Sequence, residues 1–399
     1  MTELLRRRHL LAAAALGAAW PVRAQPQAQA RAFLLGFLSQ ADDPRFEPQT
    51  LLKAWPDAPW GRSAPAAQIA LDDTAIALQG AGWLGARLIA EEASDAASLP
   101  NSLDLLLRQG VRHVVLELPA AGVAAVTAAA RGKDVILFNA AAPEDALRAA
   151  QCAPYLLHVL PSHAMQMDAL TQWLVAHKWN KPLVLHGPTA GDRLLLAAFQ
   201  RSAKRFGLKP VATKSFKMSN DPRERDLGNI RLLTSERDYD AVMVFDAEGE
   251  FAREAPYRPV LPRPVLGSNG LTAQAWSAWY ERHGAPQLSR RFQRKAARAM
   301  GSYDWAAWMA ARAAAEAASA GPRTPIAQQL RDLKGTLAFD GYKGQRLSFR
   351  AWDGQMRQPL LLVHGNGVSD VAPVEGFLHP RSTLDTLGWD QPETGCKAS

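Results

Sequence analysis

Carboxylates gather directly after an apolar run, Tyr239–Phe245, near the middle of the chain. The residues that follow this run are Asp246, Ala247, Glu248, Gly249 and Glu250. A further carboxylate, Glu117, lies near the end of a second apolar run, Val111–Leu118. Clustered carboxylates suit a hard cation, which takes several oxygen ligands. They can equally bind an amine or the hydroxyl groups of a polar solute, or simply face solvent where a strand ends.

Glu117, Asp246 and Glu248 would lie together if their two strands end at facing edges. These three carboxylates are therefore a candidate metal site for a lanthanide or calcium ion, with an organic ligand as the alternative. No other cofactor is expected. Short polar side chains follow other apolar runs in the same way. The full set of candidate ligand-binding residues is Ser39, Gln40, Glu117, Asn139, Thr189, Asp246, Glu248, Ser268 and Asn269.

No group of residues in the sequence predicts catalysis. Gly80–Gly85 matches the glycine pattern of dinucleotide-binding loops, but a predicted helix precedes it and a predicted strand follows, whereas such a loop needs the opposite order. The sequence has no G-x-x-x-x-G-K-[ST] phosphate loop, no H-E-x-x-H zinc motif and no G-x-S-x-G nucleophile turn. We therefore expect a protein that is not an enzyme and has no catalytic residues.

Apolar runs alternate with segments of helical periodicity through most of the chain. In the first part, strands are expected at 31–38, 86–91, 111–118 and 134–139, with helices at 65–79, 101–109 and 121–131. After a crossover at 155–160, strands are expected at 181–186, 209–217, 239–245 and 265–267, with helices at 163–178, 192–206 and 224–234. Helices are then expected at 271–283, in a following basic segment that ends at 298, at 303–320 and at 325–334. β-like segments are expected at 336–339, 345–351 and 358–364.

Near-continuous apolar strands between helices are typical of parallel sheets that are covered on both faces. The sequence therefore predicts an α/β fold of two doubly wound parallel-sheet lobes with a cleft between them. We expect residues 31–155 and 265–335 in lobe 1, residues 156–264 and 336–368 in lobe 2, and a C-terminal tail at 369–399. Ligands of such sheets bind beyond the carboxyl ends of the strands, where the candidate residues lie.

The first 24 residues have the features of an export signal. Arg6, Arg7 and Arg8 precede a short run of small apolar residues, and Val22-Arg23-Ala24 matches a cleavage site. The segment Arg7–Leu11 resembles the twin-arginine signature, but Arg6 stands where a Ser or Thr is usual, so Sec export remains the alternative. We expect residues 1–24 to be a cleaved signal peptide and the mature protein to be periplasmic.

The composition is that of a soluble globular protein. About 375 residues remain after the predicted signal, which is more than a single core usually holds. The formal net charge is +8, and the signal contains four arginines and one glutamate, which leaves the remainder near +5. The basic residues do not alternate with aromatic ones, so no nucleic-acid partner is expected. No other stretch reaches 18 apolar residues, so no stable membrane insertion is expected.

The sequence has two cysteines, Cys152 and Cys396. An even number of cysteines in an exported protein favours a disulfide, which here would hold the tail against the middle of the chain. Two buried free thiols are the alternative.

Several segments resemble a known family. The crossover Leu156–Met165 with Trp179, and the order of elements from residue 31 to about 364, resemble the type I periplasmic binding proteins, the branched-chain amino-acid class of ABC-transporter receptors. More specifically, the chain is similar to the subfamily associated with PQQ-dependent alcohol dehydrogenase systems. The segments that carry this similarity are Cys152, Tyr303–Trp308, Leu347–Gln355, Arg357–Pro359, Leu384–Gly388, Glu393 and Cys396.

The resemblance implies a periplasmic solute-binding protein that closes on a small ligand and delivers it to the permease and ATPase subunits of an ABC importer. It also implies a link to PQQ-dependent alcohol oxidation. Because relatives are linked to lanthanide-dependent alcohol oxidation, a lanthanide or other metal receptor or chaperone that supports a quinoprotein dehydrogenase is the alternative function. Ala140–Ala142 stands where amino-acid receptors usually place small hydroxyl residues, which argues against an ordinary amino-acid ligand.

Overall fold

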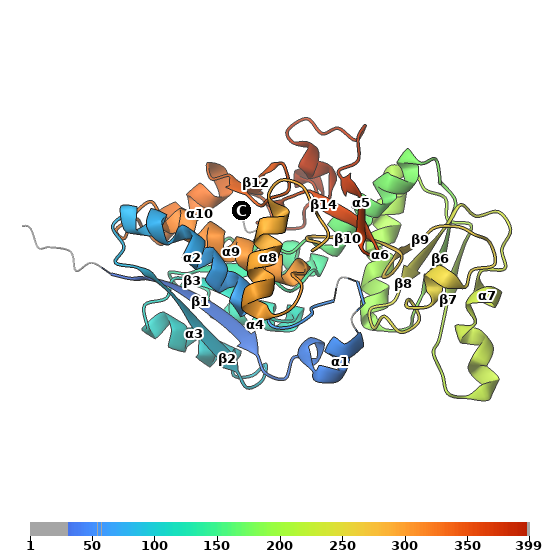
Figure 1. The fold of residues 1–399 in the computed structure, drawn as a ribbon, viewed down its shortest axis with the longest axis horizontal. Helices are drawn as coiled ribbons and strands as arrows, with labels where there is room; N and C mark the ends of the chain where they lie inside the picture. The colour runs from blue at the N-terminus through green and yellow to red at the C-terminus, as the bar shows by residue number, and fades with distance from the viewer. Residues whose placement is uncertain (1–30, 54, 57, 397–399) are drawn as a thin grey trace, which may run out of the picture. The chain divides into compact units, whose positions relative to one another are not determined.

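The structure is a computed structural model that describes residues 31–53, 55–56 and 58–396. The predicted signal peptide, residues 1–24, lies outside the described residues. The described chain forms an α/β fold with two parallel-strand sheets, each at the centre of one lobe (Figure 1). Within this part of the chain, no helix combines the length and the apolar character that a membrane crossing needs.

The sheet of the first lobe has five parallel strands in the order β2-β1-β3-β4-β5. The strands are β1 (Phe33–Gln40), β2 (Ala86–Ala93), β3 (His113–Glu117), β4 (Ile136–Asn139) and β5 (Leu156–His158). The α-helices between them are α1 (Pro48–Lys53), α2 (Ala64–Gly80), α3 (Leu99–Arg108) and α4 (Ala120–Ala129). All residues of β3 and β4 are buried, which explains why the sequence of these strands is apolar without alternation.

The sheet of the second lobe has seven strands in the order β15-β14-β10-β9-β8-β6-β7. Its parallel part consists of β6 (Pro182–His186), β7 (Ala212–Ser215), β8 (Ala241–Phe245), β9 (Val265–Gly267) and β10 (Leu271–Gln274). Two antiparallel strands, β14 (Leu360–His364) and β15 (Gly367–Ala372), complete it. The helices of this lobe are α5 (His163–Ala176), α6 (Ala190–Phe206) and the short α7 (Ile230–Leu233).

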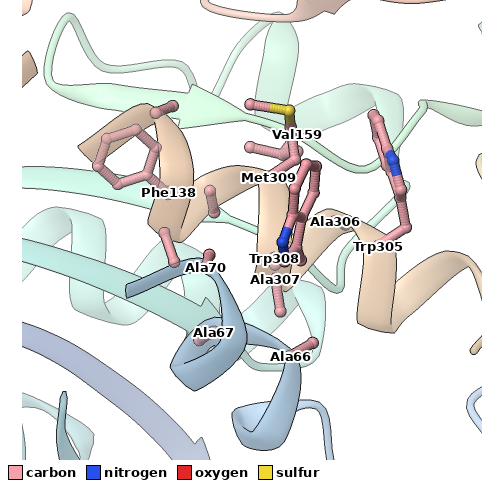
Figure 2. Packing of buried hydrophobic residues seen from close by; sticks show 14 of the residues in the cluster. Ala66, Ala67, Ala70, Phe138, Val159, Trp305, Ala306, Ala307, Trp308 and Met309 are labelled. Carbon is pink, nitrogen blue, oxygen red and sulfur yellow. The ribbon is translucent and has the colours of Figure 1, made fainter. Parts of the chain in front are cut away.

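Three later helices return to the first lobe. They are α8 (Ala285–Ala296), α9 (Ser302–Ala318) and α10 (Ile326–Gly335). Both α8 and α9 pack against α2, and α9 also contacts β1 and β3. Figure 2 shows the α2–α9 interface, where small side chains such as Ala66, Ala67 and Ala70 face α9. The absence of large side chains on α2 at this position lets the two helices approach closely.

A small third sheet also belongs to the first lobe. It consists of β11 (Phe339–Asp340), β12 (Arg346–Phe349) and β13 (Met356–Arg357). The ring of Phe349 lies 6.3 Å from that of Phe138 on β4, and Gln355 forms a β-bridge with His158 at the end of β5. The chain therefore passes between the lobes three times: after β5, after β10 and before β14.

The first crossing is held by a buried arginine, Arg148. Its guanidinium donates to Gln355 Oε1 over 2.8 Å, to Ala142 O over 2.8 Å and to Leu160 O over 2.9 Å. Burial lowers the pKa of Arg148 to about 10. These bonds join the β4–β5 connection, the crossing and the third sheet.

The predicted fold class, two lobes built on parallel sheets, is confirmed. The helix predicted at 271–283 is wrong, because Leu271–Gln274 is β10, and the next helix begins at Ala285. The helix predicted at 224–234 is a 3-10 helix, Pro222–Gly228, followed by α7. The tail predicted to start at 369 begins within β15.

Some lobe boundaries also differ from those predicted. Residues 265–274 were expected in lobe 1, but β9 and β10 extend the sheet of the second lobe. Residues 156–158 were expected in lobe 2, but β5 is the edge strand of the first sheet. The third sheet, within the range 336–368 expected in lobe 2, packs on the first lobe. Strand pairing between residues far apart in the chain decides these boundaries, and local patterns do not report it.

Candidate functional site

A cavity of about 610 Å³ lies where loops that follow β1, β4, β8 and β9 meet. Residues of both lobes line it. From the first lobe these are Pro44, Arg45, Thr50, Trp55, Pro56, Ala58, Pro59, Pro143 and Tyr303. From the second lobe they are His163, Gln166, Met167, Leu170, Leu195, Asp246, Ala247, Glu248, Gly267, Ser268, Thr272 and Ala273. Most of these side chains are apolar, with a limited number of polar groups, as is typical of a site for a small ligand.

Arg45 is the only Lys or Arg among the described residues that line this cavity. It lies in a 3-10 helix, Pro44–Phe46, that begins at the N-cap Asp43 directly after β1. Asp43 is fully buried and accepts bonds from Arg45 Nε over 3.0 Å and Nη2 over 2.7 Å. Arg45 Nη1 donates to Ala141 O over 2.6 Å. The guanidinium is thus held in one orientation at the cavity wall.

The charge of Arg45 is stable although the residue is largely enclosed. Burial alone would lower the pKa of Arg45, but the hydrogen bond to Asp43 and the nearby acidic groups raise it above its ordinary value. A guanidinium has five N–H groups, and bonds to described residues use Nε–H, one N–H of Nη1 and one of Nη2. A guanidinium is a common partner of carboxylate ligands, because its N–H groups form charge-assisted hydrogen bonds.

The first two turns of α5 form the opposite wall. Ser162 caps the helix by accepting from Met165 N over 3.2 Å, which fixes where the helix starts. His163, Gln166, Met167 and Leu170 then follow at helical spacing, so they share one face, and all four line the cavity. His163 Nδ1 lies 3.3 Å from Gln166 Oε1.

The acidic loop after β8 forms part of the same wall. Asp246 is buried, and it accepts from Ala252 N over 2.8 Å and from Glu248 N over 3.2 Å, so its carboxylate holds the loop in place. Burial raises the pKa of Asp246 against the opposing effect of these bonds. Ser268 Oγ accepts from Asp246 N over 2.9 Å, whereas Glu248 is exposed.

Trp55 of the first lobe contacts Gly249 of the second. Gly249 has a φ of +75°, and a Cβ at this position would lie 2.8 Å from the Trp55 ring. A side chain at residue 249 would therefore displace the indole, so glycine here permits an aromatic contact between the lobes beside the cavity.

Three of the predicted ligand-binding residues line the cavity: Asp246, Glu248 and Ser268. The structure places the others elsewhere. Asn139 accepts from Ala141 N and Ala142 N and donates to His158 Nδ1, so it organises the β4–β5 connection. Thr189 caps α6 together with Asp192. Asn269 donates to Ala252 O over 3.0 Å.

The remaining predicted residues lie at the end of β1 and β3. Ser39 and Gln40 are buried, and Gln40 Nε2 donates to Asp42 Oδ1 over 2.6 Å. Glu117 is completely buried and accepts from Ser63 N over 2.7 Å and Ser63 Oγ over 2.5 Å, with Arg62 Nη1 at 3.4 Å. Burial raises the pKa of Glu117, although the bonds from Ser63 oppose this shift.

The predicted metal set is not assembled in this structure. Glu117 is engaged within the first lobe and does not line the cavity that Asp246 and Glu248 line. Among the described residues, no group of three or more His, Cys, Asp or Glu side chains is placed to hold a metal ion. The predicted disulfide is present: Cys152 and Cys396 are bonded, with their Cα atoms 5.6 Å apart.

Sequence reasoning missed Arg45, Trp55, His163 and Gln166. The rule that ligands bind beyond strand ends extends to Arg45, which lies five residues after β1, whereas Ser39 and Gln40 at the strand end itself do not line the cavity. His163 follows the crossover and a Ser cap, a position at a helix start that could have drawn attention to it.

Residues 80–252 match the family model described as periplasmic binding protein. A periplasmic binding protein from Burkholderia mallei superposes with a TM-score of 0.66 at 15% identity, covering 92% of this chain and 99% of that chain. The chain has the type I periplasmic-binding-protein fold. No curated protein sequence matches it.

Two further structures share the type I fold. One is a branched-chain amino-acid ABC transporter ligand-binding protein from Burkholderia xenovorans, with a TM-score of 0.64, 17% identity and coverage of 83% of this chain and 90% of that chain. The other is an ABC transporter solute-binding protein from R. palustris in complex with benzoate, with a TM-score of 0.60, 13% identity and coverage of 92% and 99%.

Proposed function

We propose that this chain is a periplasmic solute-binding protein of an ABC importer. We further propose that its ligand is a small organic anion with an apolar body. The observation that carries both is the cavity of about 610 Å³, whose walls come from both lobes and whose one described Lys or Arg is the oriented Arg45. A ligand that contacts both walls would favour closure of the lobes, because it binds the closed state better than the open one.

The chemistry of the cavity supports this ligand class. The oriented guanidinium of Arg45 suits a carboxylate, and a charge-assisted hydrogen bond of this kind is worth roughly 1.5–3 kcal/mol. Trp55, Met167, Leu170 and Tyr303 supply apolar and aromatic surface for the rest of the molecule. The solved relative that binds benzoate shows that the type I fold accommodates such a solute.

The test is a calorimetric titration of the purified mature protein with each of five ligands: benzoate, 3,4-dihydroxybenzoate, isoleucine, calcium and lanthanum. We expect an aromatic or apolar carboxylate to bind and to be released from the protein chemically unchanged, since no turnover is proposed. In the double variant Asp43→Asn/Arg45→Gln, the affinity for the carboxylate ligand should fall at least tenfold. Asp43 is replaced as well because its buried carboxylate would otherwise lose its ion-pair partner. Arg290→Gln, at an exposed arginine of α8, is the matched control and should bind as the wild type does.

We also propose a link to PQQ-dependent alcohol oxidation, which rests on the sequence resemblance. Four-electron oxidation of a primary alcohol, through the aldehyde and its hydrate, yields a carboxylate, the group that we propose Arg45 binds. Disruption of the gene should slow growth on an alcohol whose oxidation requires the quinoprotein dehydrogenase, and leave growth on succinate unchanged. In this role the permease and ATPase subunits of the importer are the protein partners.

The alternative function is a periplasmic lanthanide or calcium receptor, or a metal chaperone for the dehydrogenase. The observation in its favour is that Asp246 and Glu248 both line the cavity. The calcium and lanthanum arms of the same titration decide between the two functions.

A further inference from the structure

Helix α5 lies between the ligand cavity and the C-terminal segment of the chain. His163, Gln166 and Met167 line the cavity. Asp168 and Gln172, on a different face of the same helix, form hydrogen bonds with the C-terminal segment. We call residues 382–396 of this segment the strap.

The strap is bound to the second lobe through buried polar groups. Gly388 N donates to Asp168 Oδ2 over 2.8 Å, and Gln172 Nε2 donates to Thr386 Oγ1 over 3.1 Å. Arg201 and Arg205, on α6, pair with Asp168 and also donate to Gly388 O over 2.7 and 2.8 Å. Asp168 and Gln172 are fully buried, so the strap satisfies groups of the lobe interior.

One glycine of the strap fits where another residue would not. Gly388 has a φ of +82°, and a Cβ there would lie 2.8 Å from Met165 Cγ of α5 and 3.3 Å from Arg350 Nη1. The strap backbone therefore passes directly between α5 of the second lobe and Arg350 of the first.

The strap is also bound to the first lobe. Arg350, in the loop after β12, donates to Asp385 Oδ1 over 2.8 Å and to Leu387 O over 2.6 Å. Arg357 Nε lies 2.9 Å from the same carboxylate. Beyond these contacts, the Cys152–Cys396 disulfide joins the end of the strap to the loop before β5.

We propose that the strap positions α5 for ligand binding and limits how far the two lobes separate. Three crossings alone leave a hinge that can open. The strap adds a fourth connection, docked on the helix that forms one wall of the cavity and covalently fixed to the lobe that forms the other wall. Separation of the lobes must therefore displace α5 or undock the strap. The effect on ligand binding rests on the proposed solute-binding function, whereas the effect on α5 and on the lobes does not.

The proposal is tested with two variants and a matched control. Cys396→Ser removes the covalent anchor and keeps the other contacts. Gly388→Ala forces a side chain between α5 and Arg350. Gly376→Ala is the control, because Gly376 has a similar φ of +97° but no atom within 4 Å of its Cβ position. Two quantities are measured for each variant without ligand. One is the rate of amide hydrogen exchange in α5. The other is the distribution of distances between spin labels attached to non-canonical residues at positions 76 and 232, which are exposed and lie on α2 of the first lobe and α7 of the second.

We expect amide exchange in α5 at least tenfold faster in both strap variants than in Gly376→Ala, and a wider distance distribution. With benzoate as the probe, dissociation should be at least fivefold faster. Unchanged α5 exchange, or an unchanged distance distribution, in both strap variants would overturn the proposal. If benzoate does not bind the wild type, the proposed ligand class fails, but the two ligand-free measurements still decide the role of the strap.

Discussion

The ammonium of Lys343 lies 3.5 Å from the ring centroid of Trp305, inside the first lobe. Lys343 Nζ also donates to Gln358 Oε1 over 2.8 Å and to Pro359 O over 3.2 Å, at the third crossing between the lobes. Burial holds the pKa of Lys343 well below its ordinary value. An aromatic ring and two neutral oxygens thus enclose an amine that would be charged in water.

This burial predicts a pH dependence of stability. Because the pKa of Lys343 is lower in the folded state, the unfolded chain binds more protons, so the free energy of unfolding should rise as pH rises toward the unfolded pKa of lysine. Lys343→Met should flatten this rise between pH 7 and 10, as measured by urea unfolding. Lys209→Met, at an exposed lysine, should keep the wild-type slope. Parallel slopes for Lys343→Met and wild type would contradict the prediction.

A second pH effect is expected on the acidic side. His113 is buried, its Nε2 lies 2.9 Å from Gln329 Oε1, and burial lowers its pKa to about 4 from 6.5. The unfolded chain therefore takes up a proton first as pH falls below about 6.5. Between pH 7 and 4.5 this single group should remove about 2.5 kcal/mol of stability. In His113→Gln the loss over this range should be smaller by about that amount, while the exposed His364→Gln behaves as wild type.

The interface between α2 and α9 should reject larger side chains. Ala70 is fully buried there, among other alanines of both helices (Figure 2). Ala70→Leu should lower the free energy of unfolding by about 1–3 kcal/mol, because the helices cannot separate without losing their other contacts. Ala77→Leu, on the exposed side of α2, should change stability by less than about 0.5 kcal/mol. Equal denaturant midpoints for the two variants would show that the interface can repack.

Metal binding gives the sharpest test of the alternative function. We expect lanthanum and calcium to leave the tryptophan fluorescence of the mature protein unchanged, since Glu117 does not join Asp246 and Glu248. Asp246→Asn should then change affinity for the organic solute only. A saturable metal response that is lost in Asp246→Asn, with thermal stability retained, would instead support the metal receptor.

Much of the fold was predictable because the strands carry strong local patterns. The apolar run predicted as a strand at 111–118 is β3, and the alternation with helices correctly indicated parallel sheets. One segment that differs is β10, which is only four residues long. Its neighbours on the sheet include β14, almost 90 residues later in the chain. Its short sequence is compatible with a helix, and the pairing that decides its structure is not local.

The candidate site was predictable only in part. The rule that ligands bind beyond strand ends predicted Asp246, Glu248 and Ser268, and these three residues line the cavity. Their contact with a ligand stays a prediction. The same rule does not distinguish a polar residue that faces a ligand from one whose side chain holds a turn. Asn139 is of the second kind, because it accepts a hydrogen bond from Ala142 N. Arg45 and His163 belong to different lobes, so their shared cavity depends on tertiary structure that no local pattern contains.

The interleaving of the lobes along the chain has a consequence for biosynthesis. Trp83 Nε1, three residues after α2, donates to the carbonyl oxygen of Ala318, which is the last residue of α9 and lies 235 residues later in the chain. The ribosome therefore produces the parallel strands of the second lobe before it produces the helix that covers α2 in the first. A nascent chain cannot complete one lobe and then begin the other, as many two-domain proteins do. Both lobes must reach their final packing together, late in synthesis or after it.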